Sequence, residues 1–348
     1  VSVLYWSTSA DLRRKSTMNC SVTSHSRFCP LTPAECAAGA FRSMSVYATI
    51  ATCTLNQWAM DFDGNLSRIV ESIEQAKRAG AKIRLGPELE ICGYSCEDHF
   101  FENDTLAHCW ESLAQILSSD LTDNILCDFG MPVLHENVRY NCRVICLNRK
   151  ILLIRPKMCL ADEGNYRESR WFTAWSRSFT LTQYYLPGVA RTVTGQDRVP
   201  FGVGLVSLAD TVYGVEICEE LFTANNPGIT LGLSGAEIIG NGSGSHFGIR
   251  KRTRRLELIE EQTKKNGGVY MYSNQKGCDG SRLFFDGSSL VCINGETVAI
   301  GQQFGIFDVE VVVATVALVD VRNHRSGIPS RGIQAMSAPS VPRVEALY

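Results

Sequence analysis

The chain lacks long hydrophobic runs and an excess of charge of either sign. No run of about 18 apolar residues occurs, so we expect no transmembrane helix. Lysine and arginine total 34 against 36 aspartate and glutamate residues, which gives a formal net charge of −2. This balance gives no reason to expect bulk binding to nucleic acid or to a membrane surface. We find no internal repeat, and 348 residues suffice for one large domain or two ordinary ones.

Cysteine, in contrast, is abundant, with 14 residues spread along the chain. Several of them, such as Cys142, Cys146 and Cys292, lie within apolar runs. A chain of this length can build a hydrophobic core without disulfides, and buried thiols stay reduced inside cells. We therefore expect reduced, buried thiols and a cytoplasmic location.

The first 43 residues differ in composition from the rest. They are rich in Ser, Thr, Cys and Arg and show no sustained period. They also lack the apolar core of a secretory signal. We expect residues 1–43 to be an atypical, disordered extension. Met44, which directly precedes the first strand-like run, is a candidate start of the working protein.

The following segment has the pattern of a β-α-β unit. Residues 46–55 alternate as a strand, Asn65 is a candidate cap for a helix ending at Lys77, and residues 81–85 form a short apolar run. Helical spacing recurs at residues 105–117 and 252–265. This opening is typical of an α/β domain.

Hairpins interrupt the α/β alternation further along. Residues 139–147 and 151–155 form one predicted strand pair, and Asn294-Gly295 is a strong turn signal inside another. We count about ten strands and three or four helices in all, which favours sheets packed face to face with helices outside. The further predicted strands are residues 124–133, 201–208, 211–218, 237–240, 268–273, 288–293, 296–301 and 309–319.

Two segments have no clean period. Residues 161–200 carry aromatic residues, arginines and Gly/Pro signals, and we expect a long excursion over the surface or the site. The tail from Arg322 onward is rich in Ser, Pro, Arg and Gly, which predicts a linker.

Three residues at the ends of predicted strands are candidates for chemistry. Glu88 is placed for general-base work, Lys157 for stabilising an oxyanion, and Cys218 for nucleophilic attack. Taken singly, each is more typical of a surface acid, a solvated lysine and a buried structural cysteine.

The neighbours of Cys218 oppose its reactivity. Glu216, Glu219 and Glu220 surround it in the sequence, and nearby negative charge raises the pKa of a thiol. A reactive Cys218 therefore requires a cation close by and a carboxylate able to accept its proton. Lys157 and Glu88 meet these two requirements.

Together these segments resemble the nitrilase, or carbon-nitrogen hydrolase, superfamily, whose triad is Glu, Lys and Cys in this chain order. Over about residues 46–325 they resemble more closely the glutaminase domains of eukaryotic glutamine-dependent NAD synthetases. The strings that carry this likeness are CTLNQWAMDFDGN (53–65), GPELEICGY (86–94), NVRYNCRVICLNRKILLIRPK (137–157), EGNYRESRWFT (163–173), EICEELF (216–222), NGSGSH (241–246) and NQKGCDG (274–280).

The resemblance implies a fold and a domain division. It implies a nitrilase-like α-β-β-α sandwich of two mixed sheets with helices outside. The glutaminase domain would span residues 44–325. Residues 326–348 would be a linker at the start of a synthetase domain that is missing here, because no Ser-Gly-Gly phosphate loop occurs in the chain.

The resemblance also implies a reaction. Glu88 would deprotonate Cys218, whose thiolate would attack the side-chain amide of L-glutamine. Lys157 would stabilise the oxyanion, and a water activated by Glu88 would release glutamate from the thioester. The ammonia would serve the ATP-dependent amidation of deamido-NAD to NAD by the synthetase domain.

Further assignments follow from the same likeness. Tyr166 would lie in the glutamine pocket, Ser243 or Ser245 together with Arg250 would contact the charged ends of the amino acid, and Glu220 would have a positioning role. This domain would need no metal or cofactor, whereas ATP and Mg would belong to the synthetase domain. We also expect a homo-oligomer.

Two different functions remain compatible with the same fold or site residues. The chain could be a stand-alone nitrilase-type amidase that acts on another small amide. It could also be a non-catalytic remnant, against which the intact Glu88, Lys157 and Cys218 argue.

Two short motifs would indicate binding rather than catalysis. Residues 240–244 follow a predicted strand and precede a basic segment, residues 250–255, which weakly resembles a dinucleotide-binding loop. Cys92, Cys96 and His99 are spaced as a possible zinc module, although no clean second pair lies nearby.

Overall fold

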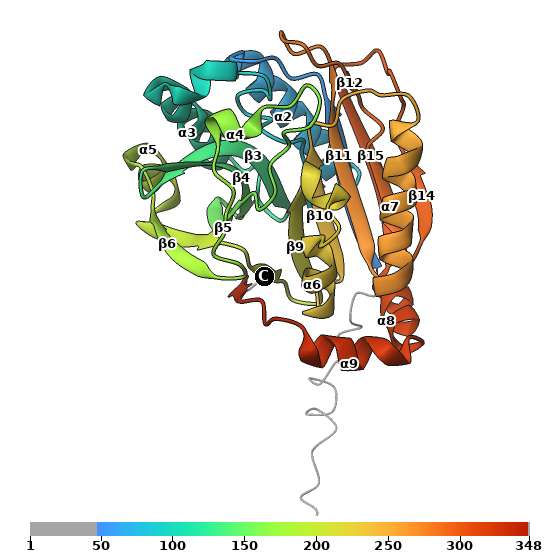
Figure 1. The fold of residues 1–348 in the computed structure, drawn as a ribbon. Coiled ribbons are helices and arrows are strands. Elements are labelled where there is room, and N and C mark those ends of the chain that lie inside the picture. The colour runs from blue at the N-terminus through green and yellow to red at the C-terminus, as the bar shows by residue number, and fades with distance from the viewer. Residues whose placement is uncertain (1–46, 347–348) are drawn as a thin grey trace, which may run out of the picture. The chain divides into compact units, whose positions relative to one another are not determined.

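The computed structural model describes residues 47–346 (Figure 1). The extension predicted for residues 1–43 lies outside the described residues. The helices are α2 (Phe62–Arg78), η1 (Glu97–Phe101), α3 (Asn103–Ser118), α4 (Glu168–Trp171), α5 (Gly188–Thr194), η2 (Cys218–Phe222), α6 (Pro227–Leu233), α7 (Lys251–Asn266), α8 (Leu318–Ser326) and α9 (Pro329–Ser337).

The strands of the described part of the chain are more numerous than the sequence predicts. They are β1 (Tyr47–Leu55), β2 (Ile83–Leu85), β3 (Leu126–His135), β4 (Val138–Leu147), β5 (Lys150–Pro156), β6 (Leu181–Tyr185), β7 (Arg198–Gly202), β8 (Leu205–Ser207), β9 (Val212–Ile217), β10 (Ile238–Ser243), β11 (Val269–Gly277), β12 (Phe285–Asp286), β13 (Leu290–Ile293), β14 (Glu296–Ile300), β15 (Val309–Ala317) and β16 (Arg343–Glu345).

The predicted β-α-β opening is present, but its helix begins earlier than expected. The side chain of Asp61 caps α2 by accepting a hydrogen bond from the backbone N–H of Gly64. Asn65 is buried instead and exchanges two hydrogen bonds with the backbone of Trp58, at 2.9 and 2.7 Å. The prediction of Asn65 as the cap was therefore wrong, because its side chain hydrogen-bonds to the loop that precedes the helix.

The strands form one continuous, curled sheet. Its order is β16-β8-β9-β10-β11-β1-β2-β3-β4-β5-β7-β6, with β15 paired antiparallel to β1. The two predicted mixed sheets are the two halves of this sheet, joined where β2 pairs parallel with both β1 and β3. In Figure 1, strands β3 to β5 lie on one side and β9 to β11 on the other.

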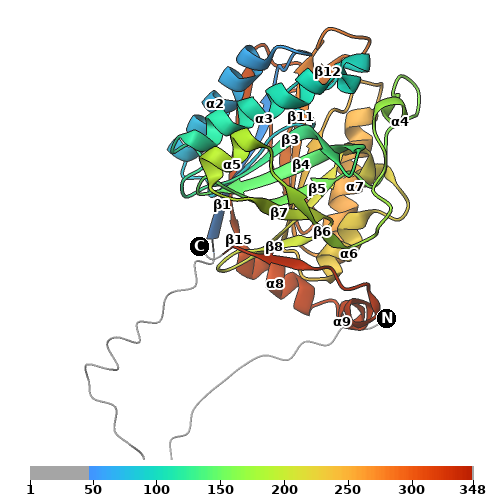
Figure 2. The same cartoon turned by 90° about the vertical axis from the view of Figure 1, so that its left-hand side faces the viewer.

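Two hydrophobic layers explain the curl. One contains strand side chains from both halves, such as Ile145 of β4 and Val215 of β9, so the inner faces meet there. The other joins the outer faces to the helices, through Ile73 of α2, Leu113 of α3 and Ile259 of α7. Figure 2 shows α2, α3 and α5 along one outer face. The predicted α-β-β-α layering is thus confirmed.

The two segments without a clean period both contain regular structure. Residues 161–200 include α4, β6, α5 and the start of β7. Residues 326–346 contain all of α9 and β16 rather than the predicted linker, and β16 pairs parallel with β8. Val341 is buried beside this pair, and Arg331 donates to the backbone carbonyls of Asn266 and Gly232. Long-range packing therefore orders a segment whose composition is typical of a linker.

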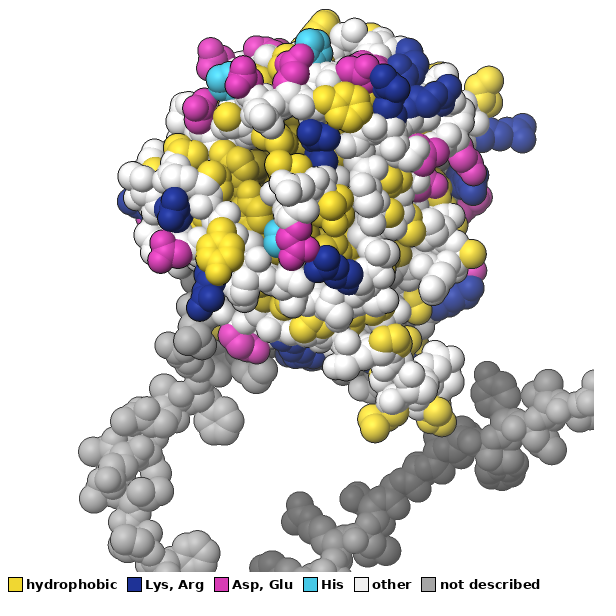
Figure 3. All heavy atoms as spheres, turned by 60° about the vertical axis from the view of Figure 1, so that its left-hand side comes forward, with side chains coloured by type: hydrophobic (Ala, Val, Ile, Leu, Met, Phe, Trp, Pro, Cys, Tyr) yellow, Lys and Arg dark blue, Asp and Glu magenta, His cyan; other side chains and the backbone are white. Residues whose placement is uncertain are grey.

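Three further features bear on the expectations drawn from composition: the surface charge, the length of the helices and the state of the cysteines. The face drawn in Figure 3 carries both basic and acidic side chains. None of the helices between residues 47 and 346 is long and apolar enough to cross a membrane. The cysteines of the described segment are free, and all are buried except Cys159 and Cys278.

Candidate active site

Three strand ends bring the predicted triad together. Glu88 follows β2, Lys157 directly follows β5, and Cys218 is the first residue of η2 after β9. All three side chains are buried, and Lys157 Nζ lies 2.6 Å from Glu88 Oε1. The structure therefore gathers an acid, a cation and a thiol from distant parts of the sequence.

The carboxylate of Glu88 is held from several sides. Its Oε1 accepts from Asn141 Nδ2 at 2.7 Å as well as from Lys157, and its Oε2 accepts from the backbone N–H of Gly244 at 3.0 Å. Its own backbone N–H donates to the carbonyl of Ser243 at 3.2 Å. Such contacts fix the direction in which the carboxylate points.

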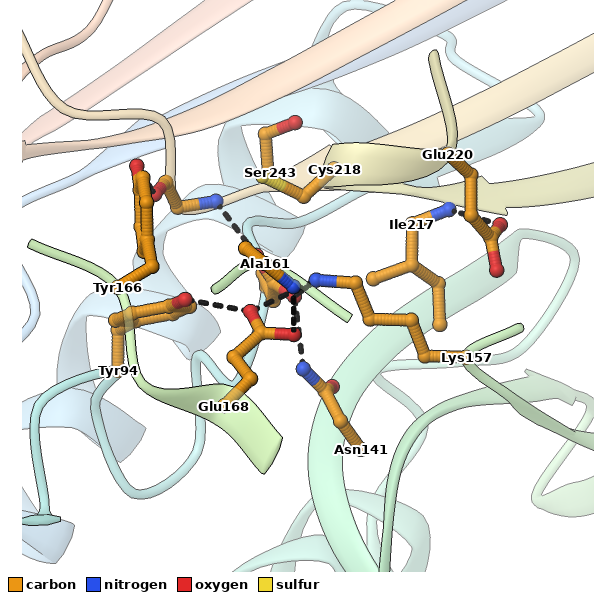
Figure 4. Close-up of polar contacts among 12 residues, drawn as sticks. Tyr94, Asn141, Lys157, Ala161, Tyr166, Glu168, Ile217, Cys218, Glu220 and Ser243 are labelled. Atoms are coloured by element: carbon orange, nitrogen blue, oxygen red, sulfur yellow. Dashed lines mark hydrogen bonds and ion pairs between the residues drawn. The ribbon is translucent and has the colours of Figure 1, made fainter. Parts of the chain in front are cut away.

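A second carboxylate, that of Glu168, completes the cluster and was not predicted from the sequence. Glu168 Oε1 lies 2.8 Å from Lys157 Nζ and accepts from Tyr94 Oη at 2.5 Å, while its Oε2 accepts from the backbone N–H of Ala161 at 3.0 Å. Figure 4 shows Lys157, Glu168 and Cys218 converging from separate segments. The signal in the sequence was a glutamate two residues after Tyr166 in a family-like string.

The electrostatics of the cluster keep the thiol protonated at rest. Burial raises the pKa of Cys218 far above its usual value, Glu88 raises it further, and Lys157 opposes both. For Lys157, burial lowers the pKa, but Glu168 and Glu88 together outweigh burial and leave it charged. The site therefore holds a fixed cation beside a neutral thiol.

Within the cluster, Glu168 is a carboxyl whose pKa lies near neutral pH. Burial raises its pKa to about 7, against the opposing attraction of Lys157. A carboxyl with a raised pKa stabilises the fold at low pH, and this contribution is lost as pH rises through about 7. We expect Glu168 to contribute about 2 kcal/mol more to the free energy of unfolding at roughly pH 5 than at roughly pH 8.

Urea unfolding of the parent and of Glu168→Gln at several pH values measures this contribution. Because glutamine does not titrate, the variant should lose about 2 kcal/mol of the parent's pH dependence over that range. Glu74→Gln, on the solvent-facing side of α2 with 52% of its side chain exposed, is the matched control and should keep the parent's dependence. Identical pH dependence in the parent and Glu168→Gln would contradict the assignment.

Cys218 itself has a strained backbone. Its φ angle is +41°, a left-handed value that is uncommon for any residue except glycine. Its backbone N–H donates to Asn241 Oδ1 at 2.9 Å. Strain of this kind persists only where surrounding contacts enforce it, and it is frequent at reactive sites.

A cavity of about 470 Å³ opens beside Cys218. Of the predicted substrate residues, Tyr166, Ser245 and Arg250 line this cavity. Ser243 does not, since its buried Oγ donates to Asn241 Oδ1 at 2.8 Å. The cavity is further lined by Glu163, Gly164, Glu219, Phe222, His246, Ile249, Lys251 and Arg254.

Glu220 lies behind the cluster rather than in the cavity. Its Oε1 accepts from Arg155 Nη1 at 2.6 Å and from the backbone N–H of Met158 at 2.5 Å, and its Oε2 accepts from the backbone N–H of Ile217 at 2.8 Å. One carboxylate thus connects the end of β5 to the end of β9. A positioning role for Glu220 stays a prediction.

The two predicted binding motifs have different structures from those expected. Residues 240–244 lie largely within the buried strand β10, so they do not form a phosphate-binding loop. Cys92 and Cys96 are buried, whereas His99 is exposed and contacts Glu102. Within residues 47–346 no three His, Cys, Asp or Glu side chains are grouped so that they could hold a metal ion.

Comparison with known proteins identifies the family of the chain. Residues 49–326 match the family described as carbon-nitrogen hydrolase. The chain is 57% identical to the glutamine-dependent NAD(+) synthetase of Homo sapiens over 85% of its own length and 42% of that protein. For the synthetase of Saccharomyces cerevisiae the identity is 54%, over 85% and 41%. The chain therefore spans about two fifths of the length of the curated relatives it matches.

Solved structures give the same picture. A glutamine-dependent NAD(+) synthetase from Cytophaga hutchinsonii superposes with a TM-score of 0.70 at 28% identity, covering 78% of this chain and 43% of that one. An amidase from Nesterenkonia superposes with a TM-score of 0.61 at 16% identity, covering 81% and 95%, which is evidence of a shared fold alone. With its sandwich fold and its match over most of the described residues, the chain belongs to the carbon-nitrogen hydrolase family.

Proposed function

We propose that the chain hydrolyses the side-chain amide of L-glutamine to glutamate and ammonia through a thioester on Cys218. The observation that carries this proposal is the Lys157 ammonium held between Glu88 and Glu168 beside a buried thiol that lines a cavity. Identity of more than half with glutamine-dependent NAD(+) synthetases supports glutamine as the substrate.

The first chemical step forms the carbon–sulfur bond. Glu88 accepts the proton of Cys218 as the sulfur attacks the amide carbon, and the electron pair of the C=O bond moves onto oxygen. This coupling is required because burial and Glu88 disfavour a free thiolate. Lys157 stabilises the oxyanion that forms. The backbone N–H of Cys218 is not a further oxyanion donor, because it is committed to Asn241.

The later steps return the site to its starting state. Collapse of the tetrahedral intermediate breaks the C–N bond, and Glu88 passes its proton to the departing nitrogen, which leaves as ammonia. Glu88 then takes a proton from water, which attacks the thioester. As the C–S bond breaks and glutamate is released, Glu88 returns this proton to the sulfur, which restores the thiol of Cys218 and the carboxylate of Glu88.

The cavity has charges of both signs, as a free amino acid requires. Glu163 and Glu219 can face an α-ammonium group, while Arg250, Lys251 and Arg254 can face an α-carboxylate. Tyr166 contributes an aromatic wall, and Lys251 Nζ lies 5.4 Å from the centre of its ring. This distribution supports a zwitterionic substrate rather than a simple neutral amide.

Ammonia release by the purified chain from three amides tests the proposal. Glutaramic acid lacks the α-amino group of glutamine, and butyramide lacks both charged groups. We expect kcat/KM to fall by about 10- to 100-fold for each charged group removed, since each loses a charge-assisted contact. Equal kcat/KM values for glutamine and butyramide would instead support a nitrilase-type amidase for another small amide.

The wider role follows from the relatives. We propose that the ammonia is used for ATP-dependent amidation of deamido-NAD to NAD by a synthetase domain. The glutaminase steps above use only side chains and water, so ATP and Mg are assigned to that domain. A cytoplasmic homo-oligomer is part of the same proposal.

A further inference from the structure

We propose that Glu216, Tyr270 and Asn241 form a positioning relay that holds the backbone of Cys218 in its strained, reactive conformation. The relay touches neither the cavity nor the reacting atoms, so its members are positioning residues. The inference rests on the proposed function, because it assigns to these residues a contribution to the turnover of Cys218.

The relay is a continuous chain of buried hydrogen bonds. The backbone N–H of Cys218 donates to Asn241 Oδ1 at 2.9 Å, and Asn241 Nδ2 donates to Tyr270 Oη at 2.9 Å. The hydroxyl of Tyr270 donates to Glu216 Oε2 at 2.6 Å. Glu216 Oε1 accepts from the backbone N–H of Gly228 at 2.6 Å. Glu216 lies on β9, Asn241 on the adjacent strand β10 and Tyr270 on β11. Cys218 directly follows β9.

Only a carboxylate at position 216 gives this chain its direction. In its ionised form Glu216 accepts at both oxygens, so the Tyr270 hydroxyl then donates to Glu216 and accepts from Asn241. Asn241 must then present its Nδ2 to Tyr270 and its Oδ1 to Cys218. If the amide were reversed, its NH₂ would face the N–H of Cys218, and two donors would oppose each other.

Glu216 is an unusual choice for a purely structural position. Glu90, Asp128 and Glu220 are also fully buried, and each pairs with a buried arginine. Glu216 makes no ion pair with any residue in the 47–346 segment and relies on neutral donors. Burial accordingly raises its pKa to about 7. An unpaired buried carboxyl is costly to the fold, which is consistent with retention for a role in the site.

The relay makes its contact at Cys218, the residue whose backbone is strained. The φ angle of Cys218 is +41°, and the bond from its N–H to Asn241 anchors the residue at that angle. Release of the anchor would let the thiol turn away from Glu88 and Lys157. The cavity walls would be unaffected, so the loss should fall on kcat and on the reactivity of the thiol rather than on KM.

Steady-state kinetics of Tyr270→Phe, Glu216→Gln and the double variant test the relay in the full 348-residue chain. We expect each single variant to lower kcat by about 10- to 100-fold, the cost of a disrupted buried hydrogen bond, with KM for glutamine within about threefold of the parent. Because both residues act through one chain, the double variant should lose little more than either single variant.

Tyr213→Phe is the matched control. Tyr213 is equally buried, lies on β9 and donates to Asp128 Oδ2 at 2.8 Å, so its loss also removes a buried tyrosine–carboxylate bond. Its kcat should stay near that of the parent. A loss of kcat in Tyr213→Phe as large as in Tyr270→Phe, or losses that multiply in the double variant, would overturn the relay. Glu216→Gln keeps the shape of the side chain and serves alone if Tyr270→Phe does not fold.

The rate of alkylation of Cys218 by iodoacetamide, followed by peptide mass spectrometry, separates this inference from the proposed function. If the parent releases no ammonia from glutamine, the proposed function fails, yet alkylation still tests the relay. We expect the alkylation rate of Cys218 to change in Tyr270→Phe and Glu216→Gln but not in Tyr213→Phe. Equal rates in all four proteins would contradict the relay even if the chain hydrolyses glutamine.

Discussion

Replacement of Cys218 by alanine is expected to abolish ammonia release from glutamine, with a loss in kcat on the order of 10⁴-fold or more. The reason is chemical, because the covalent intermediate forms on the thiol that Glu88 and Lys157 face, and alanine offers no nucleophile there. The measurement is ammonia production coupled to a dehydrogenase. In the parent, rapid quenching followed by intact-mass analysis should also detect one glutamyl group bound to the protein.

Cys278→Ala provides the control for this substitution. Cys278 is exposed and donates to the carbonyl of Ser281, away from the cluster. It should retain the turnover of the parent, and both variants should unfold at similar urea concentrations. If Cys218→Ala turned over glutamine as fast as Cys278→Ala, the thioester mechanism would be contradicted.

Replacement of Lys157 by methionine should affect both catalysis and stability. Methionine keeps a similar apolar stem but removes the ammonium that contacts Glu88 and Glu168. We expect kcat to fall by roughly 10²- to 10³-fold, as for loss of an oxyanion donor. The free energy of unfolding should fall by about 3 to 5 kcal/mol at neutral pH, because two buried carboxylates lose their shared cation.

A second substitution separates the two effects. Adding Glu168→Gln to Lys157→Met removes one of the facing acids, so it should recover part of the lost stability and none of the lost kcat. The control is Lys150→Met, at the exposed start of the same strand β5, which should match the parent in kcat, because its ammonium donates to the backbone carbonyl of Thr194 and not to the cluster. Full activity in Lys157→Met would rule out its role at the oxyanion.

The likeness to the nitrilase superfamily predicted the triad, and the strand ends at which its residues stand are local features of the sequence. Apolar runs followed by turn residues mark where β2, β5 and β9 end, and Glu88, Lys157 and Cys218 stand just beyond them. The chemical needs of a thiol flanked by glutamates then indicated a cation and a base. None of this required knowledge of which strands are neighbours.

Glu168 was missed because its place depends on long-range packing. It begins a helix of only four residues, within a segment that has no hydrophobic period. Its contacts with Tyr94, Lys157 and Ala161 are set by the fold rather than by spacing. The tail was misjudged for a related reason, since pairing of β16 with β8 joins residues far apart in the sequence.

The contacts of Glu220 have a consequence for the motion of the site. Because one buried carboxylate connects Arg155 and Met158 to Ile217, the strand ends carrying Lys157 and Cys218 cannot separate without breaking an ion pair and two backbone hydrogen bonds. Local opening at this point would leave a buried carboxylate, a buried guanidinium and two backbone N–H groups without these partners, which opposes separation of the two strand ends. The distance between cation and nucleophile is set when the chain folds, and an arriving amide meets a geometry that is already in place.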